Sequence, residues 1–224
     1  MLQLPSLFRP VPLREGQDAM RAAVELAPEE GAPAPSRGAG TLCFVRAAGR
    51  VEAAVVLEPD MPLRQARIAR HVAANALADA LVVLGPPELP VELRWDGTVV
   101  LNSGAVGRLH LAAAPAAEDE VPEWLVVGFT CRLAFPPGHE SGLLPGETAL
   151  SEEGYEDVDA EAVTDAWARH FLSGLDEWQA RGPDRAFRNL MARLLDHAGE
   201  KRGIDPATGG LVLERDGVRE IFPL

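Results

Sequence analysis

The apolar residues of this chain recur with two different periods. Short runs rich in Val, Leu, Phe and Cys predict strands at 41–47 and 51–58, which form a hairpin around residues 48–49. From Pro62 onward, apolar residues recur at helical spacing until the Gly-Pro-Pro sequence at 85–87 stops the run. Because many residues of this helix are alanine, we expect it to pack closely on a sheet.

The segment 91–110 predicts two strands joined by a tight turn and followed by a third strand that glycine interrupts. Trp95 ends the first run, and Asp96 with the glycine after it would supply the two positive-φ positions of a type I′ turn. Gly104 and Gly107 keep the next strand bare of side chains. A ligand could therefore lie against this backbone.

The same patterns predict the remaining elements. They are a weak helix over 17–26, a strand over 123–133, a helix from the N-cap Asp159 to Gly182, and a second helix over 185–198. Residues 1–15 predict an irregular lead-in, and the Pro-, Gly- and Ala-rich stretch 27–40 predicts a long loop. The tail 210–224 predicts a short hairpin that must pack on another surface, because two strands alone are marginally stable in water.

Composition places the chain among soluble globular proteins. It has 224 residues, of which 47% are hydrophobic and 25% charged, and no apolar run is long enough to span a bilayer. Cys43 and Cys131 both lie in apolar strand-like runs, where a free cysteine behaves as a small buried hydrophobe. We therefore expect a reducing, cytoplasmic setting and no membrane association.

The formal net charge of −13 argues against a nucleic-acid partner, because a phosphate-binding surface needs clustered Lys or Arg. Between residues 109 and 168 acids are frequent and Arg132 is the one Lys or Arg, which indicates a solvated acidic face or a docking face for a basic partner. The five histidines lack the paired spacing of a zinc site, and no Gly-x-x-x-x-Gly-Lys phosphate loop is present. We expect no intrinsic metal.

The segment around Trp95 resembles the core of the biotin/lipoate protein ligases. In that family a Lys-Trp-Pro-Asn-Asp strand end leads through an Asn-Gly turn to a catalytic lysine on a strand of small residues. Trp95, Asp96 and Asn102 stand at corresponding places, whereas Ala105 stands where the family has its lysine. The one lysine of this chain is Lys201, far downstream.

Further motifs follow in the order of that family. A later strand keeps Gly128 of the family's Ile-Gly-x-Gly-Ile-Asn strand, with Thr130 at the second glycine and Arg132 at the asparagine. Residues 36–40 are the nearest remnant of a Gly-Arg-Gly-Arg loop, and 148–154 resembles a Thr-Ser-Leu-x-Glu-Glu-x-Gly element. The order of these motifs is stronger evidence than any one of them.

The resemblance implies an α/β fold like that of the class II aminoacyl-tRNA synthetases and biotin ligases, with a mixed, largely antiparallel sheet flanked by helices. We expect this domain to span 1–203 and a small β-hairpin appendage to span 204–224. The family activates biotin, lipoate or a medium-chain acid such as octanoate with ATP, or moves an acyl group directly, and transfers it to a lysine of a carrier domain. The resemblance thus implies these substrates, magnesium brought with ATP, and a biotinyl or acyl carrier partner. Some relatives are dimers.

The resemblance also implies a ligand pocket. Strand alternation puts Ala105 and Gly107 on one face of their strand. It puts Val106, Arg108 and His110 on the other, unless a bulge at the glycines re-aims Arg108. The residues that would line the pocket are Arg37, Gly38, Trp95, Asp96, Asn102, Gly104, Gly107, Arg108, Gly128 and Arg132.

Three functions compete. The first is an active biotinyl or acyl transferase in which Arg108 or Arg37 replaces the lysine. The second is a degenerate ligase fold that binds a ligand or a carrier domain without chemistry, and the third is an accessory subunit whose acidic face holds a partner. The Trp-Asp strand end, the asparagine turn and Gly128 favour the first two, and neither cysteine has an evident base partner that would make it a nucleophile. Ligase-like cofactor attachment is the interpretation that we carry forward.

Overall fold

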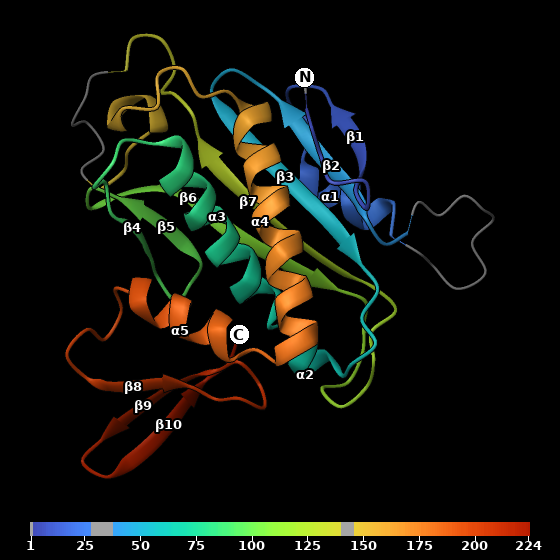
Figure 1. Cartoon of the computed structure of the whole chain (residues 1–224), viewed down its shortest axis with the longest axis vertical. Helices are drawn as coiled ribbons and strands as arrows, with labels where there is room; N and C mark the ends of the chain where they lie inside the picture. The colour runs from blue at the N-terminus through green and yellow to red at the C-terminus, as the bar shows by residue number, and fades with distance from the viewer. Residues whose placement is uncertain (1, 28–37, 140–145) are drawn as a thin grey trace.

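A seven-stranded sheet forms the centre of the molecule (Figure 1). The structure is a computed structural model that describes residues 2–27, 38–139 and 146–224. The strands are Arg9–Leu13 (β1), Thr41–Arg46 (β2), Arg50–Leu57 (β3), Val91–Leu93 (β4), Thr98–Leu101 (β5), Gly104–Ala113 (β6) and Leu125–Arg132 (β7). They lie in the order β1-β2-β3-β7-β6-β5-β4, with β1 parallel to β2 and the other neighbours antiparallel. The predicted fold class, a mixed, largely antiparallel sheet flanked by helices, is confirmed.

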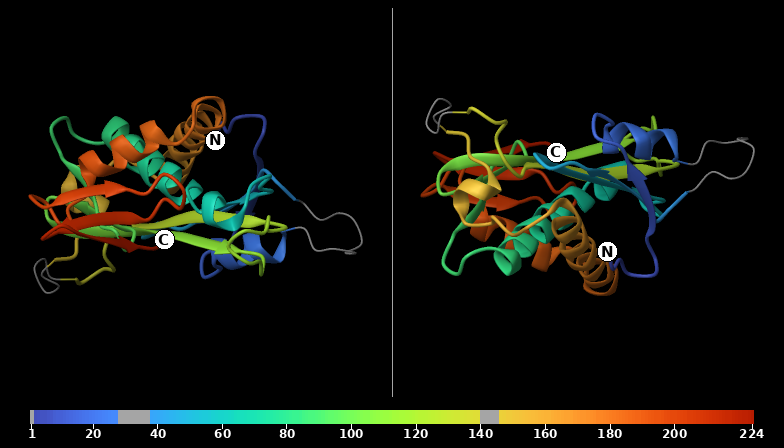
Figure 2. Two further views of the ribbon diagram at one scale, coloured as in Figure 1. Left: turned by 90° about the horizontal axis from the view of Figure 1, so that it is seen from below. Right: turned by 90° about the horizontal axis from the view of Figure 1, so that it is seen from above.

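Helices cover the two faces of this sheet unequally (Figure 2). They are Ala19–Glu25 (α1), Leu63–Ala66 (α2), Ala69–Leu84 (α3), Ala160–Arg181 (α4) and Asp184–Arg193 (α5), with a short 3-10 helix at Leu150–Glu153. The long helices α3 and α4 lie side by side across one face, whereas α1 packs on the other against β2, β3 and β7. One face is therefore covered far more completely than the other.

Aromatic side chains fill the space between α4 and the sheet. Trp167 stacks on Phe171, with ring centroids 5.1 Å apart, and contacts Phe129 of β7 at 5.0 Å. All three rings are almost completely buried. The Trp167 indole N–H donates to the carbonyl oxygen of Ala73 in α3 at 3.2 Å, so its one polar atom is satisfied. These contacts fix α3 and α4 to one another and to the sheet.

The starts of the last two helices agree closely with the prediction, but the end of the second helix does not. Asp159 caps α4 by accepting the backbone N–H of Ala162 at 2.8 Å, as predicted. The helix predicted over 185–198 ends instead at Arg193. The chain leaves the helix there because Leu195 donates its backbone N–H to the carbonyl oxygen of Leu93 at 2.8 Å, beside the sheet edge.

The tight turns of the central segment differ from the prediction. A type I′ turn needs positive φ at both central residues. That turn lies between β5 and β6, where Asn102 and Ser103 have φ of 46° and 70°. At the predicted position only Gly97 has positive φ, because Asp96 uses its carboxylate to accept the backbone N–H of Thr98 at 2.9 Å. The predicted type I′ turn at Asp96 is therefore wrong.

A β-bulge changes which face of the sheet the side chains of β6 point to. Gly107 pairs with Val99 and Ala105 with Val100, which leaves Val106 as an extra residue. Val106 is buried in the core on the α3–α4 face, with 3% of its surface exposed, whereas Arg108 is exposed. The prediction that Val106 and Arg108 share a face is wrong, because simple alternation fails across the bulge.

The two ends of the chain hold strands that the sequence did not predict. Part of the expected irregular lead-in forms β1, whose Pro10 and Pro12 are compatible with the edge of a sheet. The expected C-terminal hairpin is present as Leu211–Arg215 (β9) and Val218–Phe222 (β10), and its turn has positive φ at Asp216 and Gly217. A third strand, Lys201–Ile204 (β8), joins it, so the small sheet has the order β10-β9-β8. The expected domain boundary at 203 falls within β8.

Two further observations concern the two cysteines and the lengths of the apolar helices. Cys43 and Cys131 are both free and buried, as expected of small hydrophobes. Among the helices of the described residues, none is long and apolar enough to cross a membrane.

Candidate functional site

Trp95 lies in the loop between β4 and β5, where several distant segments hold it. Its backbone N–H donates to Oδ2 of Asp196 at 2.5 Å, and its carbonyl oxygen accepts from both Nη atoms of Arg70 at 3.3 Å. The indole Nε1 donates to the carbonyl oxygen of Pro223 at 3.3 Å, and the ring lies 5.3 Å from the ring of His71. Trp95 therefore joins the C-terminal sheet to the main domain at the edge of the groove described next.

Arg108 projects from β6 on the face away from α3 and α4. Its Nη2 lies 2.5 Å from Oδ2 of Asp96 and 3.4 Å from the hydroxyl of Thr98. The Arg108 and Asp96 side chains are 50% and 56% exposed, so water screens the ion pair strongly. Burial opposes ionisation of Asp96, but the hydrogen bonds from Thr98 and the Arg108 charge outweigh it and lower the pKa of the carboxyl. A weak, exposed pair of this kind can exchange its carboxylate for an anionic ligand.

A groove of about 470 Å³ lies beside Arg108. Arg67 at the C-cap of α2, Arg70 in the first turn of α3, and Leu224 also line it. Arg67 pairs with Glu118 at 2.7 Å, whereas Arg70 donates to the uncharged Trp95 carbonyl. Burial lowers the pKa of Arg70, but an arginine in a protein stays protonated. Of the three arginines that line the groove, Arg67 and Arg108 are thus paired with acids, and Arg70 forms no ion pair with the described residues.

A second hollow, of about 290 Å³, adjoins the first and shares Arg108 with it. Ala105, Thr130 and Arg132 line it. Arg132 is already engaged: it pairs with Glu147 at 2.6 Å and donates to the carbonyl oxygen of Thr148 at 3.0 Å. Arg132 also lies over the ring of Phe135, 4.7 Å from its centroid, so Arg108, which contacts Asp96 and Thr98, is held by fewer protein groups among the described residues.

His110 stands two residues beyond Arg108 on the same face of β6. Its Nε2 lies 3.1 Å from the hydroxyl of Thr130 on β7. Burial, followed by the positive charge of Arg108, lowers the pKa of His110 and favours the neutral ring. A neutral imidazole beside a hydroxyl can accept or donate a proton at a bound ligand.

Three of the four glycines proposed for the pocket pack closely against protein atoms. A Cβ on Gly104 would lie 2.8 Å from Cβ of Thr148, and one on Gly128 would lie 2.7 Å from Sδ of Met20 in α1. A Cβ on Gly107 would lie 2.5 Å from Sγ of Cys131. The absence of side chains at these positions therefore has a packing reason.

The remaining residues proposed from the sequence are spread more widely. Arg37 lies outside the described residues. Gly38 lies next to Glu58, which follows β3. Thr130 of the second hollow pairs with Glu52 of β3, six residues before Glu58. Gly38 and the hollow are therefore roughly 20 Å apart along the sheet. Asn102 forms the exposed turn after β5 and lines neither hollow. The structure brings together Trp95, Asp96, Gly107, Arg108 and Arg132, and it separates Gly38 and Asn102 from them.

Sequence reasoning did not assign Arg70 and Arg67 to the site. The available signal was their spacing, because residues three apart lie on the same side of a helix. Nothing in the sequence showed that this side faces Arg108. No group of three or more His, Cys, Asp or Glu that could hold a metal ion occurs among residues 2–27, 38–139 and 146–224.

Comparisons with known proteins find similarity in sequence and in fold. The model of the biotin/lipoate A/B protein ligase family matches residues 4–192. A biotin–[acetyl-CoA-carboxylase] ligase of Paracoccus denitrificans is 28% identical over 200 residues, which is 80% of either chain. The crystal structure of a biotin protein ligase-like protein of unknown function from Silicibacter sp. TM1040 is similar with a TM-score of 0.82 and 29% identity, covering 100% of this chain and 97% of that one. The biotin protein ligase of Aquifex aeolicus shares the fold, with a TM-score of 0.71, 14% identity, and coverage of 96% and 95%.

Proposed function

Because the chain belongs to the biotin/lipoate A/B protein ligase family, we propose that it binds a biotinyl, lipoyl or other acyl group in the groove beside Arg108 and attaches it to a carrier domain. The observation that carries this proposal is the position of Arg108. Its guanidinium lies where two hollows meet, faces away from the helices that form the core, and among the described residues pairs with one exposed carboxylate, that of Asp96.

Guanidinium groups suit the anions of such a reaction. Arg108 offers planar N–H donors that match a carboxylate or a phosphate, and Arg70 adds a second positive charge across the groove. Ala105, at the family's lysine position, lines the adjoining hollow, so Arg108 lies close to the place where that lysine would act. In this proposal Arg108 takes over the electrostatic role.

The chemistry would proceed in two steps. First, a carboxylate oxygen of the acid attacks the α-phosphorus of ATP, and pyrophosphate leaves as the acyl-adenylate forms. Second, the amine of a carrier lysine attacks the acyl carbon, and AMP leaves as the amide forms. Both steps pass through added negative charge on oxygen, which preorganised donors stabilise. Arg108 would hold the carboxylate and then the adenylate phosphate.

Relatives support the choice of substrates. The Paracoccus denitrificans protein is named as a ligase that acts on acetyl-CoA carboxylase, and the Aquifex aeolicus ligase has been solved in complex with biotin and ATP. We infer that biotin, lipoate or octanoate with ATP are the substrates to test here. Magnesium would enter bound to the ATP phosphates rather than in a preformed protein site.

Thermal stability with a panel of ligands tests the proposal. A ligand that binds the native state raises the melting temperature by mass action. We expect an upward shift with one acid plus ATP, or with its adenylate, and a loss of most of that shift in Arg108→Ala. Arg185→Ala is the matched control, because Arg185 is also an exposed arginine that pairs with an acid, Glu177 at 2.9 Å. No shift with any ligand, or equal losses in the two variants, would contradict the proposal.

A turnover assay then separates attachment from binding. Radiolabelled acid, ATP and a carrier domain are incubated with the protein, and label on the carrier lysine is counted. We expect Arg108→Ala to lower this transfer by about 100-fold or more, and Arg108→Lys to retain part of it. Binding without any transfer would move the conclusion to the degenerate, ligand-binding alternative.

A further inference from the structure

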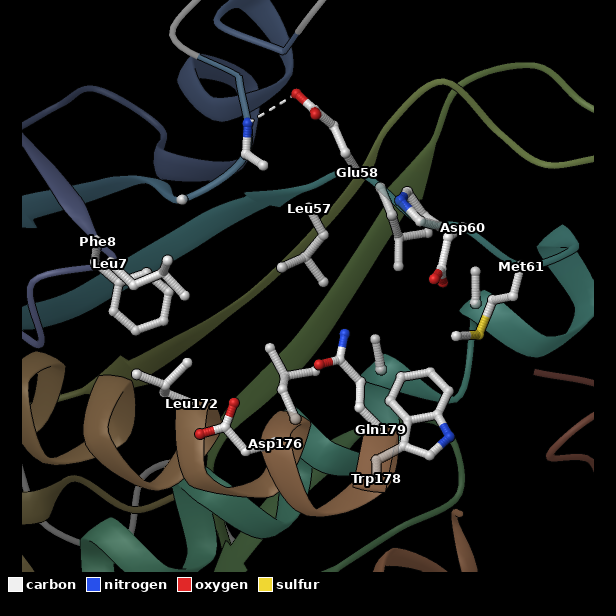
Figure 3. A pocket seen from close by; sticks show the side chains of 17 residues that line it. Leu7, Phe8, Leu57, Glu58, Asp60, Met61, Leu172, Asp176, Trp178 and Gln179 are labelled. Carbon is white, nitrogen blue, oxygen red and sulfur yellow. Dashed lines mark hydrogen bonds between the residues drawn. The ribbon is translucent and has the colours of Figure 1, made fainter. Parts of the chain in front are cut away.

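A further cavity opens on the face of the sheet that α3 and α4 cover, between α4 and the segment after β3 (Figure 3). Its volume is about 240 Å³, and it shares no lining residue with the groove or the hollow around Arg108. Pockets for drug-sized ligands usually measure roughly 300–1,000 Å³, so this one suits a smaller molecule.

The body of this pocket is apolar. Leu57 and Leu125 form its floor from β3 and β7, Met61 closes one side, and Leu172 and Trp178 of α4 form the opposite wall. Apolar side chains that remain partly open to solvent in a concave site favour the burial of an apolar group. One portion of the ligand must therefore be hydrocarbon or aromatic.

The rim of the pocket carries a single sign of charge. Glu58, Asp60 and Asp176 line it, and no Lys, Arg or His is among the seventeen residues that do. The Glu58 carboxylate accepts the backbone N–H of Ala39 at 3.0 Å, whereas the described residues give the carboxylates of Asp60 and Asp176 neither a hydrogen bond nor an ion pair. Figure 3 shows the Asp60 carboxylate turned toward α4, from which Asp176 projects. Such a rim repels an anion and attracts a cation.

Trp178 adds a second preference for positive charge. The face of an indole ring attracts an ammonium group, and tryptophan is the best of the aromatic side chains at doing so. Trp178 lines the pocket with part of its surface exposed, one helix position from the exposed rim residue Gln179 and two from Asp176. An apolar wall, an indole face and unpaired carboxylates all select the same kind of ligand.

We propose that this pocket binds a small amphipathic cation, with its apolar part against Leu57, Met61 and Leu172 and its ammonium group between Trp178 and the Asp60 carboxylate, while Asp176 adds negative charge at the other side of the mouth. Backbone hydrogen bonds hold the segments that form one wall of the pocket. The carbonyl oxygen of Val56 accepts the N–H of Gly40 at 2.8 Å, and that of Gly40 accepts the N–H of Arg9 at 2.8 Å. The proposal does not depend on the function of the groove.

Three isosteric probes test this assignment with the full chain. Phenethylammonium carries the apolar ring and the charge, phenethyl alcohol carries the ring without charge, and phenylpropionate carries the opposite charge. Binding is measured by isothermal titration, and the site is located by NMR from the shift of the indole N–H resonance that Trp178→Leu removes. We expect saturable binding of the ammonium, about tenfold tighter than the alcohol, and no binding of the carboxylate.

Variants show whether the carboxylates cause that preference. In Asp60→Asn with Asp176→Asn, we expect the ammonium to bind no more tightly than the alcohol. Asp216→Asn is the matched control, because Asp216 is an exposed acid in the turn of the distant small sheet and asparagine tolerates its positive φ of 51°. Trp178→Leu keeps the wall apolar and should weaken ammonium binding about threefold.

Several results would overturn the proposal. The first two are equal affinity for phenethylammonium and phenethyl alcohol, and tighter binding of phenylpropionate than of either. The others are a preference for phenethylammonium that survives the Asp60→Asn, Asp176→Asn double substitution, and an absence of saturable binding. An equal effect of Asp216→Asn would show that the net charge of the protein, rather than the pocket, attracts the probe. If the double variant fails to fold, the ratio of ammonium to alcohol affinity and the indole N–H shift in the unsubstituted chain still decide the question.

Discussion

The two faces of the seven-stranded sheet are built differently. On one face, α3 and α4 cover strand residues that are almost all apolar and buried, with Trp167, Phe171 and Phe129 at the centre. On the other face, α1 covers a smaller apolar cluster and leaves the region of Arg108 and His110 open. The covered face determines the fold, whereas the open part can vary its polar residues without loss of the core, and the proposed role of Arg108 lies in that open part.

The two faces also respond differently to substitution. Burial of large apolar side chains contributes several kcal/mol each, whereas an exposed ion pair contributes at most about 1 kcal/mol. Substitutions on the covered face should therefore change stability, and substitutions around Arg108 should change binding with little effect on stability.

Removal of Trp167 should give the largest effect on the covered face. Trp167→Ala leaves a cavity beside Phe129 and Phe171 and removes the hydrogen bond to the Ala73 carbonyl. We expect the free energy of unfolding to fall by ~3–5 kcal/mol, measured by urea denaturation. Val83→Ala is the control, because Val83 is 68% exposed on α3 and should change stability by less than about 0.5 kcal/mol. Similar losses in the two variants would show that this core is not closely packed.

His71 should make the stability of the covered face depend on pH. Its Nε2 donates to the Gly209 carbonyl at 2.8 Å, and burial lowers the pKa of His71 from 6.5 to about 4. Between these pH values the unfolded chain binds a proton that the folded chain does not. This contribution to stability is therefore complete above about pH 6.5 and is lost as the pH falls toward 4, by ~3 kcal/mol in total.

The measurement for His71 is urea denaturation at several pH values between 8 and 4. His71→Gln keeps an N–H donor for the Gly209 carbonyl but does not titrate. We expect the variant to lose less stability than the unsubstituted chain over this range. Parallel pH profiles of the two proteins would assign the acid sensitivity to other groups.

The sequence predicted the covered face well because its evidence is local. Apolar periodicity located α3, and the Asp159 cap located the start of α4. The predictions failed where pairing between distant segments decides the outcome. The bulge at Val106 comes from the register of β5 against β6, and β8 exists because β9 gives its four residues a partner.

Gly128 should show how tightly the other face is packed against α1. A Cβ there would lie 2.5 Å from the backbone carbonyl oxygen of Ala53 in β3 and 2.7 Å from Sδ of Met20 in α1. We expect Gly128→Ala to lower the free energy of unfolding by ~1–3 kcal/mol through overpacking. Gly203→Ala is the matched control, because Gly203 also lies in a strand and a Cβ there meets nothing within 4 Å. A neutral Gly128→Ala would mean that both β3 and α1 give way easily around this position.

The candidate site was only partly predictable. The sequence offered Arg108 and Arg37 as cations that could replace the family's lysine, since the one lysine of the chain lies elsewhere. It could not show that Arg70 faces Arg108 across a groove, or that Asp96 is the acid that pairs with Arg108. Those facts depend on how α3, the Trp95 loop and β6 meet in space, which no local pattern encodes.

Asp96→Asn should give the smallest effect and the most specific one. The substitution keeps a side-chain oxygen to accept the Thr98 N–H but removes the charge that holds Arg108 at 2.5 Å. If Arg108 binds the ligand anion, we expect ATP to bind about threefold more tightly, because a screened pair of this kind is worth less than 1 kcal/mol. Isothermal titration at fixed salt measures this change, and Asp216→Asn controls for the altered net charge. Weaker ATP binding in Asp96→Asn would show instead that Asp96 helps to form the site, because the ion pair would then be positioning Arg108 rather than competing with the ligand for it.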